Sequence, residues 1–240
     1  MSHPHDRSSD GSLPLGVTAR SAKAALTGAR QRIFARLRAA PVIPVAPPPV
    51  RSCEPPLERA VLLRQFTEAL SAAQAELHVT DSQNWPSLLL RLAVDKQVRS
   101  LLIGKGSHHG QRLIALNPDR PRLLSYDRPA PAWKSELFDQ VDAGFTAARC
   151  AIADTGSLVL WPDATEPRLL SLVPPIHFVL LDAATLQPSL RSVMASETWS
   201  QGLPTNALLI SGPSKTADIQ QTLAYGAHGP KQLIVLVSQS

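Results

Sequence analysis

The segment PIHFVLLD, residues 175–182, is a short and almost continuously apolar run that predicts a buried β-strand. A strand covered on both faces has such a run, whereas a half-buried strand alternates apolar and polar residues. The segment QLIVLV, residues 232–237, has the same character. Buried runs of this kind indicate a mostly parallel sheet whose two faces are both covered.

Outward from these two runs, the chain from residue 57 onward alternates between short apolar runs and stretches with helical spacing. Further strands are predicted at 76–80, 98–104, 149–154, 156–161 and 206–211. Helices are predicted at about 57–74, 84–95, 134–148, 188–200 and 215–225. The alternation predicts the α/β fold class, with a mostly parallel sheet and helices on both faces.

The N-terminal quarter of the chain differs in composition from this α/β domain, which we place at 57–240. Residues 1–19 are polar and contain glycine and proline, so we expect them to be disordered. Residues 41–56 are rich in proline, which cannot continue a helix or join a central strand. They are predicted to be a stiff linker.

Between these two segments, residues 20–40 are predicted to form an amphipathic basic helix. Ile33, Phe34 and Leu37 recur at helical spacing with arginines between them. Such a helix packs on its own domain, which is the favoured interpretation, or docks on a partner or a membrane surface.

The net charge of +5 comes entirely from the N-terminal part of the chain. Residues 1–60 hold nine Lys and Arg against four Asp and Glu, whereas residues 61–240 hold fifteen of each. Aromatic residues make up 5% of the chain. The domain therefore lacks the basic surface and the stacking side chains that nucleic-acid binding requires.

The two cysteines, Cys53 and Cys150, lie far apart and form no CxxC or Cys/His cluster. We therefore expect no metal site and no cofactor held by this chain alone. Cys150 stands among apolar residues and is expected to be buried. The N-terminal residues show no secretory signal, and no apolar run is long enough to span a membrane, so we expect a cytoplasmic protein.

Three polar loops are predicted to follow strands: GKGSHHG at 104–110, ADTGSLVL at 153–160 and SGPSKTAD at 211–218. Sheets of this kind bind ligands beyond the carboxyl ends of their strands, so we expect the loops to line a crevice there. Within the second loop, residues 154–157 are either a simple hairpin turn or a source of polar ligand groups.

In the third loop, Gly212 permits close backbone approach, and Ser214 or Thr216 is placed to cap the predicted helix. The N–H groups of that helix end, with Lys215 beside them, would attract an anion. Asp218 in the first turn favours the helix dipole itself and would repel an anion. The loop is therefore either a ligand loop or a helix cap, and we adopt the ligand loop as the working hypothesis.

The histidines differ in how strongly their sequence context indicates a functional role. His228 lies in GAHGP, residues 226–230, which is typical of a helix C-terminus; a turn does not need an imidazole, and imidazole suits proton transfer near neutrality. His108 and His109 are adjacent, which favours a solvated loop over a metal-ligand pair. His177 is predicted to be a hydrogen-bonded core or sheet-end residue of a strand and not a catalyst.

Three segments closely resemble the lactate-utilisation protein C family, a branch of the LUD domain proteins. They are VDAGFTAARCAIADTGSLVL (141–160), LLSLVPPIHFVLL (169–181) and ISGPSKTADIQQTLAYGAHGPKQLIVLV (210–237). The motifs follow the order found in the family, and one departure is GFTAA at 144–148, where relatives often carry a second glycine.

The resemblance implies a fold similar to the ribose-phosphate isomerase, glucosamine-phosphate deaminase and CoA-transferase group. It also implies a role in oxidising L-lactate to pyruvate beside two iron–sulfur partner proteins. Carried over by position, the motif residues are Asp154, Thr155, Gly156, Ser157, Pro175, His177, Gly212, Pro213, Ser214, Thr216, Ala217, Asp218, His228, Gly229 and Pro230.

The leading hypothesis is a subunit or accessory protein of an L-lactate oxidation system that acts with iron–sulfur partners. The alternative is a free-standing enzyme acting on a small anionic or phosphorylated metabolite. We assign Asp218 and His228 as the candidate catalytic residues. The candidate binding residues for a small carboxylate or other anion are Asp154, Thr155, Gly156, Ser157, Gly212, Pro213, Ser214, Lys215, Thr216 and Gly229.

Overall fold

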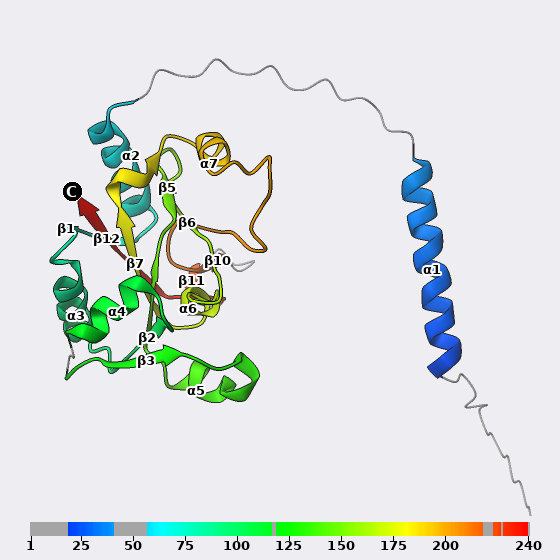
Figure 1. Ribbon diagram of the computed structural model, residues 1–240, viewed down its shortest axis with the longest axis horizontal. Coiled ribbons are helices and arrows are strands. Elements are labelled where there is room, and N and C mark those ends of the chain that lie inside the picture. Colours follow the sequence, from blue (N-terminus) through cyan, green and yellow to red (C-terminus); the bar gives the residue numbers. More distant parts are fainter. Residues whose placement is uncertain (1–18, 41–56, 117–118, 218–222, 227, 240) are drawn as a thin grey trace, which may run out of the picture. The chain divides into compact units, whose positions relative to one another are not determined.

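The computed structural model describes residues 19–40, 57–116, 119–217, 223–226 and 228–239 (Figure 1). The chain divides into two units, Met1–Cys53 and Glu54–Ser240. The predicted disordered N-terminus, apart from residue 19, and the predicted linker 41–56 lie outside the described residues. The first unit contains the helix α1 (Ala19–Ala39), where the basic helix was expected. No helix in the described ranges combines the length and the apolar character needed to cross a membrane.

The second unit is built on a six-stranded sheet in which all neighbouring strands are parallel. The strand order is β1-β12-β7-β4-β2-β3. The bounds are β1 Glu76–Asp81, β2 Ser100–Gly104, β3 Arg122–Tyr126, β4 Ala143–Ala147, β7 Ile176–Asp182 and β12 Gln232–Gln239. The predicted α/β class with a mostly parallel sheet is confirmed.

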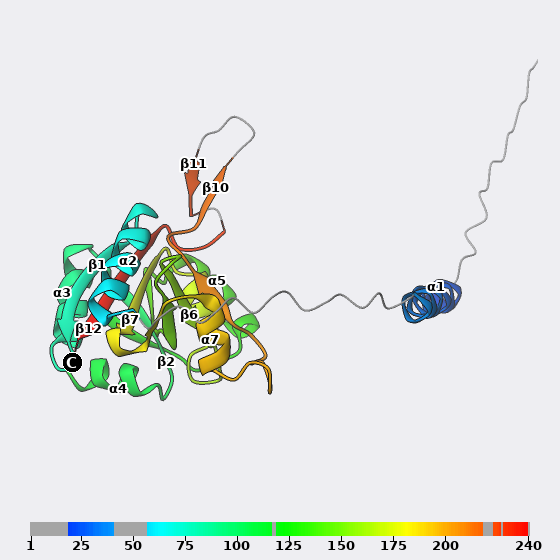
Figure 2. The ribbon, with the colours of Figure 1, turned by 90° about the horizontal axis from the view of Figure 1, so that it is seen from above.

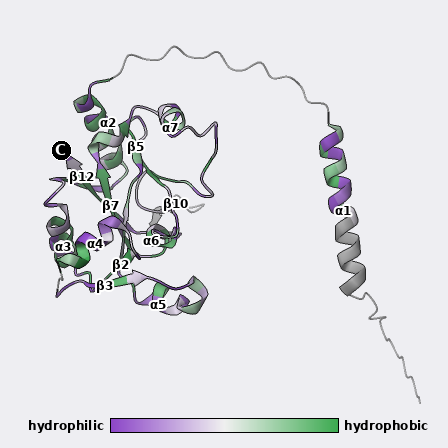
Figure 3. Ribbon diagram, viewed as in Figure 1, coloured by the Kyte–Doolittle hydropathy of each residue, from purple (hydrophilic) through white to green (hydrophobic). Residues whose placement is uncertain are grey.

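Both faces of this sheet are covered, as predicted. In β7, Phe178 and Leu180 belong to the core under α3 (Trp85–Asp95) and α4 (His108–Ala115). Val179 and Leu181 face the opposite core, under α2 (Arg59–Ala72) and a second, smaller sheet. The apolar character of β2 and β7 is visible in Figure 3. Burial of both faces explains why these strands are continuous apolar runs.

The second sheet has four short strands in the order β8-β5-β6-β9, and the sequence does not predict it as a separate sheet. Its strands are β5 Cys150–Ile152, β6 Ser157–Leu160, β8 Leu186–Gln187 and β9 Leu208–Ile210. A turn at 153–156 joins β5 to its antiparallel neighbour β6. Cys150 is buried here, as expected. The remaining short elements are η1 Ala130–Ala132, α5 Lys134–Asp139, α6 Leu169–Leu172, η2 Ala183–Thr185 and α7 Leu190–Ser196.

The helix predicted over 134–148 is wrong in its second half. The helix α5 ends at Asp139, and residues 143–147 form β4, a central strand between β2 and β7. Gly144 accounts for the difference, because the backbone of α6 crosses β4 at Leu170 with no room for a side chain at this glycine. Close packing of this kind is set by the tertiary structure and overrides the local helical spacing.

The helix predicted over 215–225 is also wrong in the part of this range that the structure describes. Residues Lys215–Ala217 and Leu223–Tyr225 form an antiparallel hairpin, β10–β11, which projects from the second unit in Figure 2. Ser214 N–H donates to Pro230 O at 2.8 Å, and Ser214 O accepts from Gly226 N–H at 2.8 Å. With both of its backbone groups bound to the returning chain, Ser214 cannot begin a helix, and GAHGP is not a helix end.

The solvated loop predicted at His108 and His109 is the first turn of α4. Ser107 caps this helix, because its Oγ accepts from Gly110 N–H at 3.1 Å. Strand β3 was not predicted either. Its residues RLLSY do not form a continuous apolar run, as suits a strand at the edge of the sheet.

His177 is a core residue of β7, as predicted, and its side chain is fully buried. Its Nε2 lies 2.9 Å from Thr146 Oγ1 on the neighbouring strand β4. Its Nδ1 contacts no hydrogen-bond partner among the described residues. Burial disfavours the charged imidazolium and lowers the pKa of His177 from 6.5 to about 3.

We predict that His177 makes the stability of the folded protein fall in acid. Between pH 6.5 and about 3 the unfolded histidine is protonated and the folded one is neutral, so unfolding takes up a proton. This group should lower the free energy of unfolding by about 1.4 kcal/mol for each pH unit through that window. Urea unfolding at several pH values should show a shallower acid slope for His177→Gln. Thr146→Val keeps the buried histidine, so an altered slope in that variant would contradict the assignment.

Candidate functional site

Two of the predicted polar loops meet through a chain of hydroxyl groups. Ser157 begins β6 after the turn at 153–156, and Ser211 follows β9. Ser157 Oγ lies 2.7 Å from Ser211 Oγ and 2.8 Å from Thr155 Oγ1. The bond between Ser157 and Ser211 thus joins the two loops side chain to side chain across 54 positions of sequence.

Glycines in both loops pack against the C-terminal end of α2. Gly156 has φ +59°, and a Cβ there would lie 2.7 Å from Leu70 N. Gly212 has φ +147°, and a Cβ there would lie 3.0 Å from Ala73 O. Each position therefore requires glycine both for its backbone conformation and for the close approach of the helix.

Residues of a third segment, 226–230, pair with Ser214 in the loop that follows β9. The backbone of Ser214 is bonded to Gly226 and Pro230, and Gly229 lies against Ser214, where a Cβ would approach Ser214 Cβ to 3.2 Å. Pro213, which lies between Gly212 and Ser214 in the sequence, is buried. We call the contact of segments 154–157, 211–214 and 226–230 the seam.

The seam lies at the amino ends of the parallel strands, whereas the sequence predicts the carboxyl ends. Lys231 N–H, just before β12, donates to Pro175 O, just before β7, at 2.7 Å. The physical reason is strand direction. Because β12 runs parallel to its neighbours, the chain that leads into it has to arrive at their amino ends.

The candidate residues are brought together only in part. Asp154, Lys215 and His228 are exposed, and Thr216 is half-buried. Asp218 lies outside the described residues, so its assignment as a candidate catalytic residue stays a prediction. The seam itself supplies hydroxyl and backbone groups, which suit hydrogen bonding more than proton abstraction.

The carboxyl end of the sheet carries a different polar group that the sequence did not single out. Glu166 accepts from Ser107 Oγ at 2.7 Å and from Ala147 N–H at 3.0 Å. Burial raises the pKa of the Glu166 carboxyl, and these two hydrogen bonds partly offset that rise. Ser107 could have been recognised as a helix cap, but Glu166 is 59 residues away and carries no local signal.

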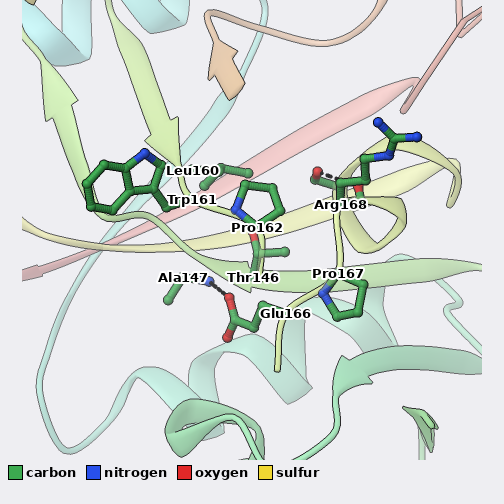
Figure 4. A pocket seen from close by; sticks show the side chains of 9 residues that line it. Thr146, Ala147, Leu160, Trp161, Pro162, Glu166, Pro167 and Arg168 are labelled. Carbon is green, nitrogen blue, oxygen red and sulfur yellow. Dashed lines mark hydrogen bonds between the residues drawn. The ribbon is translucent and has the colours of Figure 1, made fainter. Parts of the chain in front are cut away.

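Glu166 borders a small hollow, drawn in Figure 4. Thr146, Trp161, Arg168 and Ser171 also line it. Its cavity volume of about 10 Å³ is enough for about one water molecule. The hollow is therefore too small for a metabolite in this conformation.

The described residues also offer no metal centre. Among them, no group of three or more His, Cys, Asp or Glu side chains is placed to hold a metal ion. The expectation that this chain holds no cofactor stays a prediction.

We predict that Gly156→Ala destabilises the protein by at least about 2 kcal/mol, because it adds left-handed strain to a clash with the α2 backbone. The matched control is Gly202→Ala, where a Cβ meets nothing within 4 Å, and it should change stability by less than about 0.5 kcal/mol. Thermal and urea unfolding check both values. Equal stability of the two variants would mean that the loop does not pack on α2.

The match to a known protein family lies within the second unit of the chain. Residues 63–238 match the LUD domain. The uncharacterized protein NMB1437 of Neisseria meningitidis serogroup B is 38% identical, over 87% of this chain and 92% of its own. Two proteins named lactate utilization protein C are more distant. That of Bacillus subtilis is 31% identical over 48% of this chain and 55% of its own, and that of Exiguobacterium is 29% identical over 51% and 59%.

The alignments with the two lactate utilization proteins thus span little more than half of their length. A crystal structure of a DUF162 family protein from Deinococcus radiodurans shares the fold. Its TM-score is 0.54 with 21% identity, and the match covers 76% of this chain and 99% of that one. The domain match covers most of the second unit, and the chain therefore belongs to the LUD domain family.

Proposed function

We propose that this chain is a cytoplasmic subunit or accessory protein of an L-lactate oxidation system and that it acts with iron–sulfur partner proteins. The observation that carries the proposal is the convergence of the motif residues. Two of the segments that resemble lactate utilization protein C, 141–160 and 210–237, meet in the seam through Ser157 and Ser211, which are distant in sequence.

The form of the seam favours docking over catalysis. Its hydroxyl groups bond to one another, and its glycines are held against α2, so the surface is rigid. The hairpin β10–β11 extends directly from it (Figure 2). A rigid polar surface beside a projecting hairpin suits contact with a partner protein, because little conformational entropy is lost on binding.

The chemistry of lactate oxidation supports a division of labour between proteins. Conversion of lactate to pyruvate releases two electrons and two protons, which an acceptor has to take. An iron–sulfur cluster is normally held by four thiolates, and this chain has two cysteines. We therefore assign electron transfer to the partners and the binding of those partners, or of the carboxylate, to this chain.

We predict that His228→Ala lowers growth on L-lactate without lowering stability. His228 is exposed at the seam, so its loss should shift the free energy of unfolding by less than about 0.5 kcal/mol. Growth is measured in a strain that lacks the native gene and carries the variant. Lys105→Ala, which removes an exposed side chain from the loop after β2, is the control and should support normal growth. Normal growth of His228→Ala would contradict a role for this end of the seam.

We also predict that the chain purified alone under anaerobic conditions contains no stoichiometric iron or acid-labile sulfide. Co-purification with its partners should give a complex that contains both, because the thiolate ligands come from those partners. Iron and sulfide assays on the two preparations check this. A cluster in the isolated chain would contradict the assignment, and failure to recover any cluster-bearing partner would favour the free-standing enzyme.

A further inference from the structure

The helix α1 presents an apolar stripe that no other described residue of its own unit covers. Ile33 is 59% exposed, Phe34 is 44% exposed and Leu37 is 65% exposed. These three residues lie within about one turn of one another on one side of the helix, because residues three and four apart share a face. Exposed apolar side chains gathered in this way mark a surface that binds something.

Arginines flank this stripe on both sides. Arg30 lies one turn before Phe34, in line with the stripe, and Arg38 lies one turn after it, on one flank; their guanidinium carbons are 5.5 and 5.8 Å from the centre of the Phe34 ring. Helical spacing places Arg32 and Arg36 on the opposite flank. The sequence of α1, ARSAKAALTGARQRIFARLRA, contains no acidic residue.

We propose that α1 binds the surface of a membrane that contains anionic lipids. The stripe would enter the boundary between headgroups and acyl chains, and the arginines on both flanks would reach the lipid phosphates at one level. Arginine suits this position because its apolar stem follows the stripe while its guanidinium stays among the headgroups. Charge of one sign on both flanks matches a plane of anionic headgroups better than a protein surface of mixed charge.

The helix would lie on the membrane and not cross it. No helix in the described part of the chain meets the requirements for crossing, and the arginines of α1 recur at every turn of its C-terminal half. Binding by an interfacial helix combines apolar burial with electrostatic attraction, so it should weaken as salt is raised. The inference does not depend on the proposed role in lactate oxidation.

The test is sedimentation of the full chain with vesicles. Vesicles of phosphatidylglycerol and phosphatidylcholine in equal parts should bind the protein, and vesicles of phosphatidylcholine alone should bind it much more weakly. Each arginine near an anionic surface strengthens binding by roughly fivefold. The double variant Arg32→Ala/Arg36→Ala should therefore bind anionic vesicles roughly 25-fold more weakly. Leu37→Ser should also bind more weakly while keeping the dependence on salt.

A matched control removes two positive charges from the second unit. Lys134→Ala/Arg191→Ala changes two exposed residues there and should leave vesicle binding unchanged. Circular dichroism of each variant shows whether its helix content is preserved. Equal weakening by the control, or no binding of the unaltered chain to anionic vesicles, would overturn the proposal. Loss of partner binding in the α1 variants, without any lipid binding, would overturn it in favour of a protein partner.

Discussion

The insertion of β12 between β1 and β7 is the constraint on which the rest of the second unit depends. β1 pairs with no other strand in the described residues, and β7 obtains its second neighbour from the same insertion. Since β12 is formed near the end of the chain, the central sheet is completed only when the two ends of the domain sequence meet. The side chains of β12 also alternate between both large cores, so the same strand joins the two layers.

Strand direction then determines where the polar segments gather. Parallel neighbours require the chain before β12 to return to the amino ends of the strands, and this return brings Gly226 and Pro230 to the backbone of Ser214, shortly after strand β9 of the small sheet. The seam is thus a direct consequence of the topology. The loops at the carboxyl ends, where ligands of open α/β sheets usually bind, are instead tied together by Glu166 and Ser107.

The sequence predicts those parts of the fold whose burial is uniform along a segment. β7 and β12 are buried on both faces, so their apolar runs identify them without any tertiary information. β4 is also buried along most of its length, but AGFTA is not a continuous apolar run, because Gly144 makes room for the backbone of α6 at Leu170. The hairpin β10–β11 could not be predicted either, because the hydrogen bonds from Ser214 to Gly226 and Pro230 join residues distant in sequence.

The same distinction applies to the candidate site. Resemblance to a family selected Thr155, Ser157 and Gly156, and the structure brings them beside Gly212 and Ser211. The two loops were expected to share a crevice, but their location at the amino ends of the strands could not be predicted from spacing, and neither could the pairing of Glu166 with Ser107. Both depend on backbone directions that only the completed sheet defines.

The two ends of the sheet consequently differ in physical character. At the amino end, hydroxyl groups and closely packed glycines make a surface whose polar groups are fixed before any partner arrives. At the carboxyl end, the raised pKa of Glu166 reflects the burial of a carboxyl group that accepts hydrogen bonds from Ser107 and Ala147. A partner that binds the seam would gain contacts without reorganising the core, because the hydrogen bonds of Ser157 and Ser211 already hold both loops in place. That property is what an accessory subunit of a larger assembly requires.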